Sequence, residues 1–393
     1  MKLFPAFCAL AAFAAAPLLA VYAPIPEQDQ GKDLVVTLRA AVSYDSNIFG
    51  GATDAISSPI FEVAPRIAFN HSLSDQTFVS ANYGLLVSRI ENRPGDRVLD
   101  SHDLSLRAAH AFSKATNVDV SNLFMVARNP EALLNGLPLN TDQSFTRNQF
   151  DARFATAVTP KIGLQVKARS VYSKYRNAIL GRSLDRIENL YGLAGDYAIL
   201  PEVKAIAEFR HLDVYYRKLG EEKNKQSNYL MTGVDYAAAR KVTLSARLGA
   251  EWRERAREDD VTSPYAELSG RYQYAEQSFV VGGYAYTLDE SSDTARFTDQ
   301  RGHRLFVNLQ HALTPLLVAS LSAEYAPAEL QGRRSRGQVD VDEDSARTGA
   351  ALSYLPTKNW VVSAHYDYDR VRSDDASRGL ERHRVGLSAT YAF

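Results

Sequence analysis

Glu381-Arg-His-Arg-Val-Gly-Leu-Ser-Ala-Thr-Tyr-Ala-Phe393 decides the fold, because apolar residues recur in it at every second position up to a terminal phenylalanine. Val385, Leu387, Ala389, Tyr391 and Phe393 share one face, and polar or small residues occupy the other. Side chains alternate between the two faces of a β-strand, whereas apolar positions on a helix recur every three or four residues. The ending therefore predicts the closing strand of a transmembrane β-barrel. An amphipathic strand of a soluble protein is the alternative.

Segments with the same alternation recur along the whole 393-residue chain. Val242–Trp252 shows it most clearly, and the other segments are similar in length, roughly 10–14 residues, which suffices for a tilted membrane crossing. The candidate strands lie at residues 34–44, 60–71, 77–90, 101–112, 117–128, 145–158, 162–175, 186–198, 203–216, 227–237, 242–255, 264–274, 278–288, 303–313, 317–326, 346–355, 359–371 and 382–393. About eighteen strands, an even number, are expected for a bacterial barrel whose two chain ends face the periplasm.

The connections between these segments alternate in length. Short links, such as 72–76 and 238–241, are followed by longer polar links, such as 91–100 and 256–263. Outer-membrane barrels have short periplasmic turns and longer extracellular loops, whereas a soluble sandwich with Greek-key connections has no reason to keep this order. The sequence thus predicts one all-β domain over residues 34–393. Its fold class is an antiparallel, up-and-down transmembrane β-barrel in the outer membrane of a Gram-negative bacterium.

The N-terminal residues have the composition of a secretory signal peptide. Lys2 precedes an apolar run that ends in small residues, as in secreted precursors. We expect residues 1–23 to be the signal peptide, with cleavage near residues 20–23, and residues 24–33 to be a short periplasmic segment. Cys8 is the only cysteine and falls in this leader, which excludes disulfides and thiolate metal sites from the mature chain.

Composition and motifs exclude several classes of function. A net charge of -1 argues against a nucleic-acid partner, and the chain has no glycine-rich phosphate loop. The eight histidines are scattered over several predicted strands and form no metal or hydrolase motif. We therefore predict no cofactor and no enzymatic activity. An enzyme built on a barrel is the least favoured alternative.

The last residues also resemble the C-terminal signal by which Gram-negative outer-membrane proteins are recognised for insertion. Tyr391 and the terminal Phe393 are the residues that carry this resemblance. It implies that the barrel-assembly machinery is a partner, together with outer-membrane lipid and lipopolysaccharide.

The polar face of the predicted strands gives a candidate lumen. About fifteen basic and about fourteen acidic residues take the inward phase, so charges of both signs would line a barrel wide enough to hold water. The candidate lining residues are Arg39, Arg66, Arg107, Arg153, Arg169, Arg247, Glu251, Glu267, Arg271, Arg304 and Arg384. Charges of both signs favour the passage of polar or zwitterionic solutes over strong ion selectivity. The prediction is a passive, porin-like channel, and the alternative is a plugged barrel with a structural or assembly role.

Two local features depart from the regular pattern of strands and polar loops. Pro65 lies inside the second candidate strand, where it has no N–H to donate and a closed barrel has no edge, so we expect a bulge or a later strand start. The loop 129–144 contains several leucines and is a candidate constriction loop folded into the pore.

Tyr44-Asp45-Ser46-Asn47-Ile48-Phe49 follows the first strand, and Asp45 and Asn47 suit Asx turns that end a strand. This run resembles the start of the family of outer-membrane proteins known as beta-barrel porin 2. Some members of that family are encoded with exopolysaccharide synthesis and export systems. The resemblance implies a channel or export role for saccharides or exopolysaccharide, with polysaccharide-export proteins as partners. It supplies no catalytic or ligand-binding residues.

Overall fold

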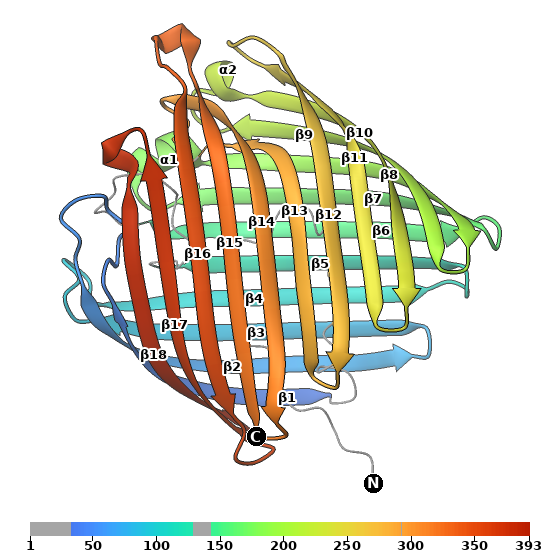
Figure 1. Ribbon diagram of the computed structural model, residues 1–393, viewed down its shortest axis with the longest axis horizontal. Helices are drawn as coiled ribbons and strands as arrows, with labels where there is room; N and C mark the ends of the chain where they lie inside the picture. Colours follow the sequence, from blue (N-terminus) through green and yellow to red (C-terminus); the bar gives the residue numbers. More distant parts are fainter. Residues whose placement is uncertain (1–32, 129–142, 292) are drawn as a thin grey trace.

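The computed structural model describes residues 33–128, 143–291 and 293–393 and forms one barrel of antiparallel strands (Figure 1). The elements are β1 (Leu34–Asp45), β2 (Ser58–Ser74), β3 (Thr77–Ile90), β4 (Val98–Ala111), β5 (Thr116–Ala127), β6 (Phe145–Ala157), β7 (Ile162–Tyr175), α1 (Ala178–Leu184), β8 (Arg186–Leu200), β9 (Val203–Tyr216), α2 (Gly220–Lys223), β10 (Lys225–Ala239), β11 (Val242–Arg255), β12 (Val261–Ala275), β13 (Ser278–Glu290), β14 (Phe297–Thr314), β15 (Leu317–Gly332), η2 (Arg334–Arg336), β16 (Val341–Tyr354), β17 (Trp360–Ser373), η3 (Ala376–Arg378) and β18 (Leu380–Ala392). The prediction of an eighteen-stranded barrel is confirmed.

Every strand pairs antiparallel with its neighbours in sequence, and β1 pairs with both β2 and β18. The closing ladder runs from Thr37 opposite Ala392 to Asp45 opposite Arg384. The amide of Phe393 extends it by donating to the carbonyl of Val36 at 2.9 Å. A closed ring leaves no unpaired strand edge, which is the condition for a sheet to exist in hydrocarbon.

The two faces of the wall differ sharply in chemistry. On β11 the side chains of Leu244, Leu248 and Trp252 point outward and are 44 to 55% exposed, whereas Glu251 and Arg253 in the opposite phase are 2 to 3% exposed. The same reversal, with large apolar residues exposed and charged residues covered, occurs on most strands. Such a surface is stable only when hydrocarbon surrounds the barrel, so the outer face is the lipid face.

The two ends of the barrel also differ. One end carries the short turns, such as the two residues between β10 and β11, and also the start of β1 and the end of β18 (Figure 1). The other carries the longer loops, which contain α1, α2, η2 and η3. We call the first end periplasmic and the second extracellular, following the rule for such barrels. No helix of the described residues is long and apolar enough to cross a membrane.

The structure corrects two expectations. The register between β2 and β3 is the same on both sides of Pro65, so there is neither a bulge nor a later start, and β2 begins at Ser58. The ladder to β3 has no pair at Pro65, and this residue faces lipid between Val63 and Ile67. In addition, β14, β15 and β16 extend five or six residues further toward the extracellular end than predicted, because polar pairs such as Glu329 opposite Asp342 continue the ladder beyond the apolar span.

Some predictions fall outside the described residues. These are the signal peptide at 1–23 and all of the segment 24–33 except Asp33. Residues 129–142 of the proposed constriction loop fall there too.

Candidate channel lumen and mouth

All eleven predicted lining residues take the phase opposite to the exposed apolar residues of their strands. Six of them form ion pairs with a carboxylate on an adjacent strand, at nitrogen-to-oxygen distances of 2.5 to 3.4 Å: Arg39 with Glu62, Arg107 with Asp119, Arg169 with Asp151, Arg247 with Asp235, Arg304 with Glu324, and Arg384 with Asp369. Because positive and negative groups meet across neighbouring strands, most of this charge is neutralised along the wall.

The other five predicted residues have different surroundings. Arg153 lies 3.8 Å from Asp119, which it shares with Arg107. Glu251 accepts from Arg253 at 2.9 Å, and Glu267 accepts from Tyr265 at 3.1 Å. The guanidinium of Arg271 lies 4.2 Å from the ring centre of Phe279. Arg66 is exposed and has no ion pair among the described residues. Among the eleven predicted residues, Arg66 and Arg271 are therefore the arginines that form no ion pair with a described carboxylate.

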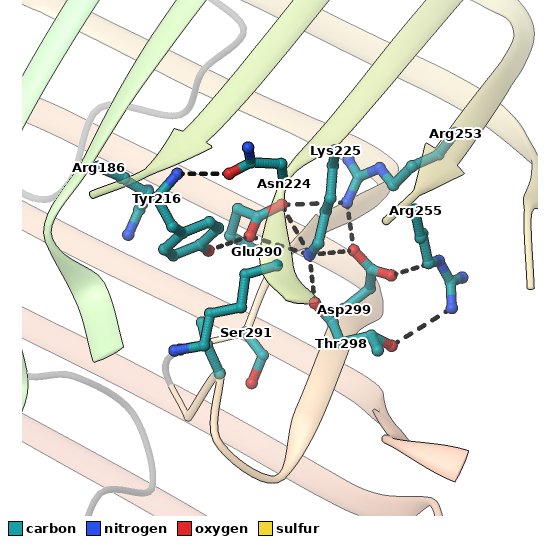
Figure 2. A network of polar contacts seen from close by, with 12 residues as sticks. Arg186, Tyr216, Asn224, Lys225, Arg253, Arg255, Glu290, Ser291, Thr298 and Asp299 are labelled. Atoms are coloured by element: carbon teal, nitrogen blue, oxygen red, sulfur yellow. Dashed lines mark hydrogen bonds and ion pairs between the residues drawn. The ribbon is translucent and has the colours of Figure 1, made fainter. Parts of the chain in front are cut away.

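A dense group of charges lies at the extracellular end, between β10, β11, β13 and β14 (Figure 2). We call Lys225, Arg253, Arg255, Glu290 and Asp299 the mouth cluster. The ammonium of Lys225 lies 3.0 Å from both carboxylate oxygens of Glu290 and 2.8 Å from Asp299. Arg253 contacts Asp299 at 2.5 Å, and Arg255 lies 3.0 Å from its other oxygen. The side chain of Asp299 has no exposed surface.

Further polar contacts surround this cluster. The hydroxyl of Tyr216 donates to Glu290 at 2.5 Å, and Arg253 donates to the carbonyl of Leu288 at 2.7 Å. A charge buried without partners costs several kcal/mol, so each of these side chains depends on the others. The mouth cluster therefore fixes the ends of β13 and β14 against β10 and β11.

The strand faces that carry the mouth cluster show where the end of the β13–β14 hairpin lies relative to the barrel wall. Glu290 and Asp299 lie opposite each other in the β13–β14 ladder. Both side chains are on the same face of the hairpin as the lipid-facing Tyr284 and Leu305. Lys225 and Arg253, in contrast, belong to the lumen-facing phase of β10 and β11. The two sets meet because the end of the hairpin folds inward, which brings its outer face against the inner face of β10 and β11. Leu288, in the outer phase of β13, is accordingly 2% exposed.

The tip of this hairpin, residues 291 and 293–296, contacts loops on both sides of the barrel. Thr294 donates to the carbonyl of Ser183, in the loop between β7 and β8, at 2.7 Å. Arg296 contacts Asp375, in the loop between β17 and β18, at 2.5 Å. Around the ring, β8 and β18 are ten strands apart in one direction and eight in the other. A segment that reaches both loops lies across the mouth.

Cations from further loops hold the same tip. The ammonium of Lys223 donates to the hydroxyl of Thr294 at 3.0 Å, and Arg333 donates to its carbonyl at 2.8 Å. Burial, and next the nearby Arg333 and Arg336, lower the pKa of Lys223 to about 8. On the other side, hydrogen bonds from Ser377 and Arg296 lower the pKa of Asp375 to about 2. The tip is thus held between groups that are charged near neutral pH.

The Tyr44–Phe49 run forms a compact turn at the seam between β1 and β18. The carboxylate of Asp45 accepts from the amide of Asn47 at 2.9 Å, which confirms the expected Asx turn. Arg382 of β18 donates to both oxygens of Asp45 at 3.0 Å, and both side chains are 2% exposed. Ile48 and Phe49 pack into a small apolar cluster with Ile60, Ile90 and Leu99. The motif therefore holds the closing strands together at the extracellular end.

Sequence reasoning missed the mouth cluster and Arg382. In β13 the buried contacts are made by Glu290, in the outer phase, while the neighbouring Asp289 takes the lumen-facing phase and is exposed. The hairpin tip also crosses the mouth, which was not predicted from the sequence. No signal in the sequence reveals the inward fold, because period two places Glu290 and Asp299 on the outer face. Among the described residues, no group of three or more His, Cys, Asp or Glu side chains is placed to hold a metal ion.

Solved outer-membrane porins have a similar overall structure. A BenF-like porin from Pseudomonas fluorescens Pf-5 superposes with a TM-score of 0.51 and 10% identity, over 92% of this chain and 98% of that chain. OccAB2 from Acinetobacter baumannii superposes with a TM-score of 0.50 and 11% identity, over the same shares of the two chains. No protein-family model and no curated protein matches the sequence. The resemblance to the beta-barrel porin 2 family therefore stays a prediction, and the finding is that this chain has the fold of an outer-membrane porin.

Proposed function

We propose that the protein is a passive channel for small polar solutes, whose extracellular mouth is narrowed by the β13–β14 hairpin. The main support is the inward fold of that hairpin, held by the mouth cluster and by contacts to loops on opposite sides of the barrel. A porin-type barrel wide enough for water needs such a narrowing to select solutes by size. The paired charges of the inner wall would admit polar and zwitterionic solutes without strong preference for either sign.

The wall charges without ion pairs are of both signs. Arg66 and Arg271 face the lumen without an ion pair among the described residues. Asp103, Asp196 and Glu267 do so as well. The wall therefore favours neither anions nor cations strongly. Saccharides fit a wall of this kind as neutral polar solutes. A role in exopolysaccharide export rests on the sequence resemblance alone.

A plugged barrel is the second candidate, because the hairpin tip itself crosses the mouth. In this reading the barrel would serve envelope assembly, and its loops would contact polysaccharide-export proteins. Neither reading needs covalent chemistry, so the protein would not be an enzyme.

Single-channel recording in planar bilayers separates the two candidates. A channel gives a steady open-state current, and Glu290→Gln should increase the conductance because it weakens the attachment of the hairpin. Glu276→Gln is the matched control, since it removes an exposed carboxylate in the short turn between β12 and β13, at the other end of the barrel. Silence from correctly folded wild-type protein would overturn the channel, and a steady wild-type current would overturn the plug. Swelling of liposomes in sugars of increasing size would then test saccharide passage.

A further inference from the structure

The lipid face of the barrel is hollowed at one place. A groove of about 520 Å³ runs over the outside of β10 to β14. Its lining includes Tyr236, Leu244, Leu268, Gly270, Gly282 and Tyr284, all in the lipid-facing phase. We call this hollow the wall groove. Its position on the lipid face means that hydrocarbon, and not water, is the surrounding medium.

The floor of the wall groove is made by small residues in register. Gly270 lies opposite Leu244 on one side and opposite Gly282 on the other. A Cβ atom added at Gly282 would meet the carbonyl oxygen of Phe306 at 3.3 Å, and one added at Gly270 would meet Cδ2 of Leu244 at 3.0 Å, so backbone and these neighbouring atoms form the floor. The larger Leu268 and Tyr284 border this row. The result is a depression with apolar sides, of the kind that a flexible hydrocarbon chain fills well.

The wall groove lies in the periplasmic half of the membrane. Tyr236 and Leu244 stand opposite each other, only a few residues above the short turn that joins β10 to β11. That turn is Arg240-Lys241, and both side chains are exposed. Of the eight short turns, it alone carries two basic residues. Tyr236 and Tyr272 stand beside it at the level where tyrosines meet lipid headgroups.

We propose that the wall groove binds one phospholipid of the periplasmic leaflet. An acyl chain would lie over Gly270 and Gly282, and the phosphate would lie between Arg240 and Lys241. Two adjacent cations at the membrane surface attract a phosphate diester. They disfavour a second copy of this chain in the same place, because each copy would bring its own pair of cations to the contact.

Native mass spectrometry of the full mature protein, released from detergent micelles and titrated with phosphatidylglycerol, measures this binding. The wild type should bind one phosphatidylglycerol molecule more tightly than any further phosphatidylglycerol molecules. Arg240→Gln/Lys241→Gln should weaken that affinity by about tenfold or more, since each cation contributes about fivefold near a lipid surface. Ala246→Leu, which places a larger side chain in the wall groove, should also abolish the preference.

Matched controls lie elsewhere on the barrel. Lys114→Gln/Lys161→Gln removes two basic residues from other short turns, and Ala350→Leu enlarges an exposed lipid-facing alanine on β16. Both control variants should still bind one lipid more tightly than any further lipids. The turn variant changes no strand, so it tests the proposal even if Ala246→Leu does not fold. Equal lipid affinity in the wild type and in Arg240→Gln/Lys241→Gln would overturn the proposal. The proposal would also be overturned if the wild type forms oligomers that Ala246→Leu dissociates. The wall groove would then bind a second copy of this chain.

Discussion

At the scale of single residues, the extracellular end is held by charges that are buried and paired. Asp45 and Arg382 illustrate the point, because they are 337 residues apart in sequence and each side chain is 2% exposed. Neither residue could have been paired from the sequence, since only closure of the barrel brings their strands together. The Asx turn of Asp45 with Asn47 is local, and the short motif was enough to predict it.

Replacing one partner of this pair should destabilise the barrel. Asp45→Ala leaves the guanidinium of Arg382 buried without its carboxylate, and the expected loss is about 3 to 5 kcal/mol of unfolding free energy. Urea unfolding in detergent, followed by tryptophan fluorescence, measures it. Arg89→Gln is the control, because Arg89 pairs with Glu91 at the surface and an exposed pair contributes at most about 1 kcal/mol. Equal losses in the two variants would show that the seam pair has no special role.

Lys223 should make the charge of the mouth depend on pH. Its pKa of about 8 means that the ammonium is protonated below pH 8 and neutral above it. Raising the pH from 7 to 9 therefore removes most of this positive charge beside Thr294, and the permeability of the channel to anions relative to cations should fall over this range. Reversal potentials in a KCl gradient measure the change. Lys223→Met should remove it, and a wild-type permeability ratio that stays flat from pH 7 to 9 would contradict the assignment.

At the scale of elements, strand periodicity predicts most of the structure and fails at one hairpin. The bounds of β3, β7, β9 and β11 agree with the sequence, because each strand has one apolar face against lipid. The ends of β13 and β14 do not follow from the pattern, since period two places Glu290 and Asp299 outside. The even or odd position of a side chain predicts whether it faces lipid or the lumen only while the strand lies in the barrel wall. Where the strand folds inward, the same phase points to the inner face of the neighbouring strands.

Removing one carboxylate of the mouth cluster should loosen the end of the hairpin alone. Asp299→Asn leaves Lys225, Arg253 and Arg255 with less negative charge, and a lost hydrogen bond to a charged group costs about 1.5 to 3 kcal/mol. Hydrogen–deuterium exchange of peptides covering 291–299 should therefore become about tenfold faster or more. Peptides covering 303–313 in the same strand provide the internal control. Faster exchange along all of β14 would instead indicate general destabilisation.

At the scale of the whole molecule, alternating link lengths and the closing strand were sufficient to predict the ring. The turn and loop alternation gave the strand count, and the ladder of β18 with β1 closes the barrel as the sequence requires. The surface of the mouth was not predictable, because the contacts of Thr294 and Arg296 join loops from opposite sides. Such contacts depend on where closed strands place their loops, and no local pattern encodes that distance.

Phe393→Ala, which keeps the backbone amide that donates to Val36, should reduce insertion into the outer membrane more than it changes the finished barrel. Phe393 is 68% exposed, and its ring contacts only Tyr391 among the described aromatic residues. A residue with so little packing contributes little to stability, so a loss would reflect recognition during assembly. Membrane fractionation of cells, beside refolding in detergent, separates the two effects. Phe112→Ala is the control, because Phe112 is 60% exposed at the same end of the barrel. An unchanged yield of membrane-inserted protein would remove Phe393 from the insertion signal.

The seam between β1 and β18 has one more consequence, which concerns the order of the chain. Asp33 precedes β1 and Phe393 follows β18, both at the end that carries the short turns, and the β1–β18 ladder is as regular as that of a hairpin. A short peptide could join Phe393 to Asp33 there. New chain termini could then be opened at another short turn, such as Glu276–Gln277. A circularly permuted barrel of this kind would keep all eighteen ladders, because the ring has no first strand once it is closed.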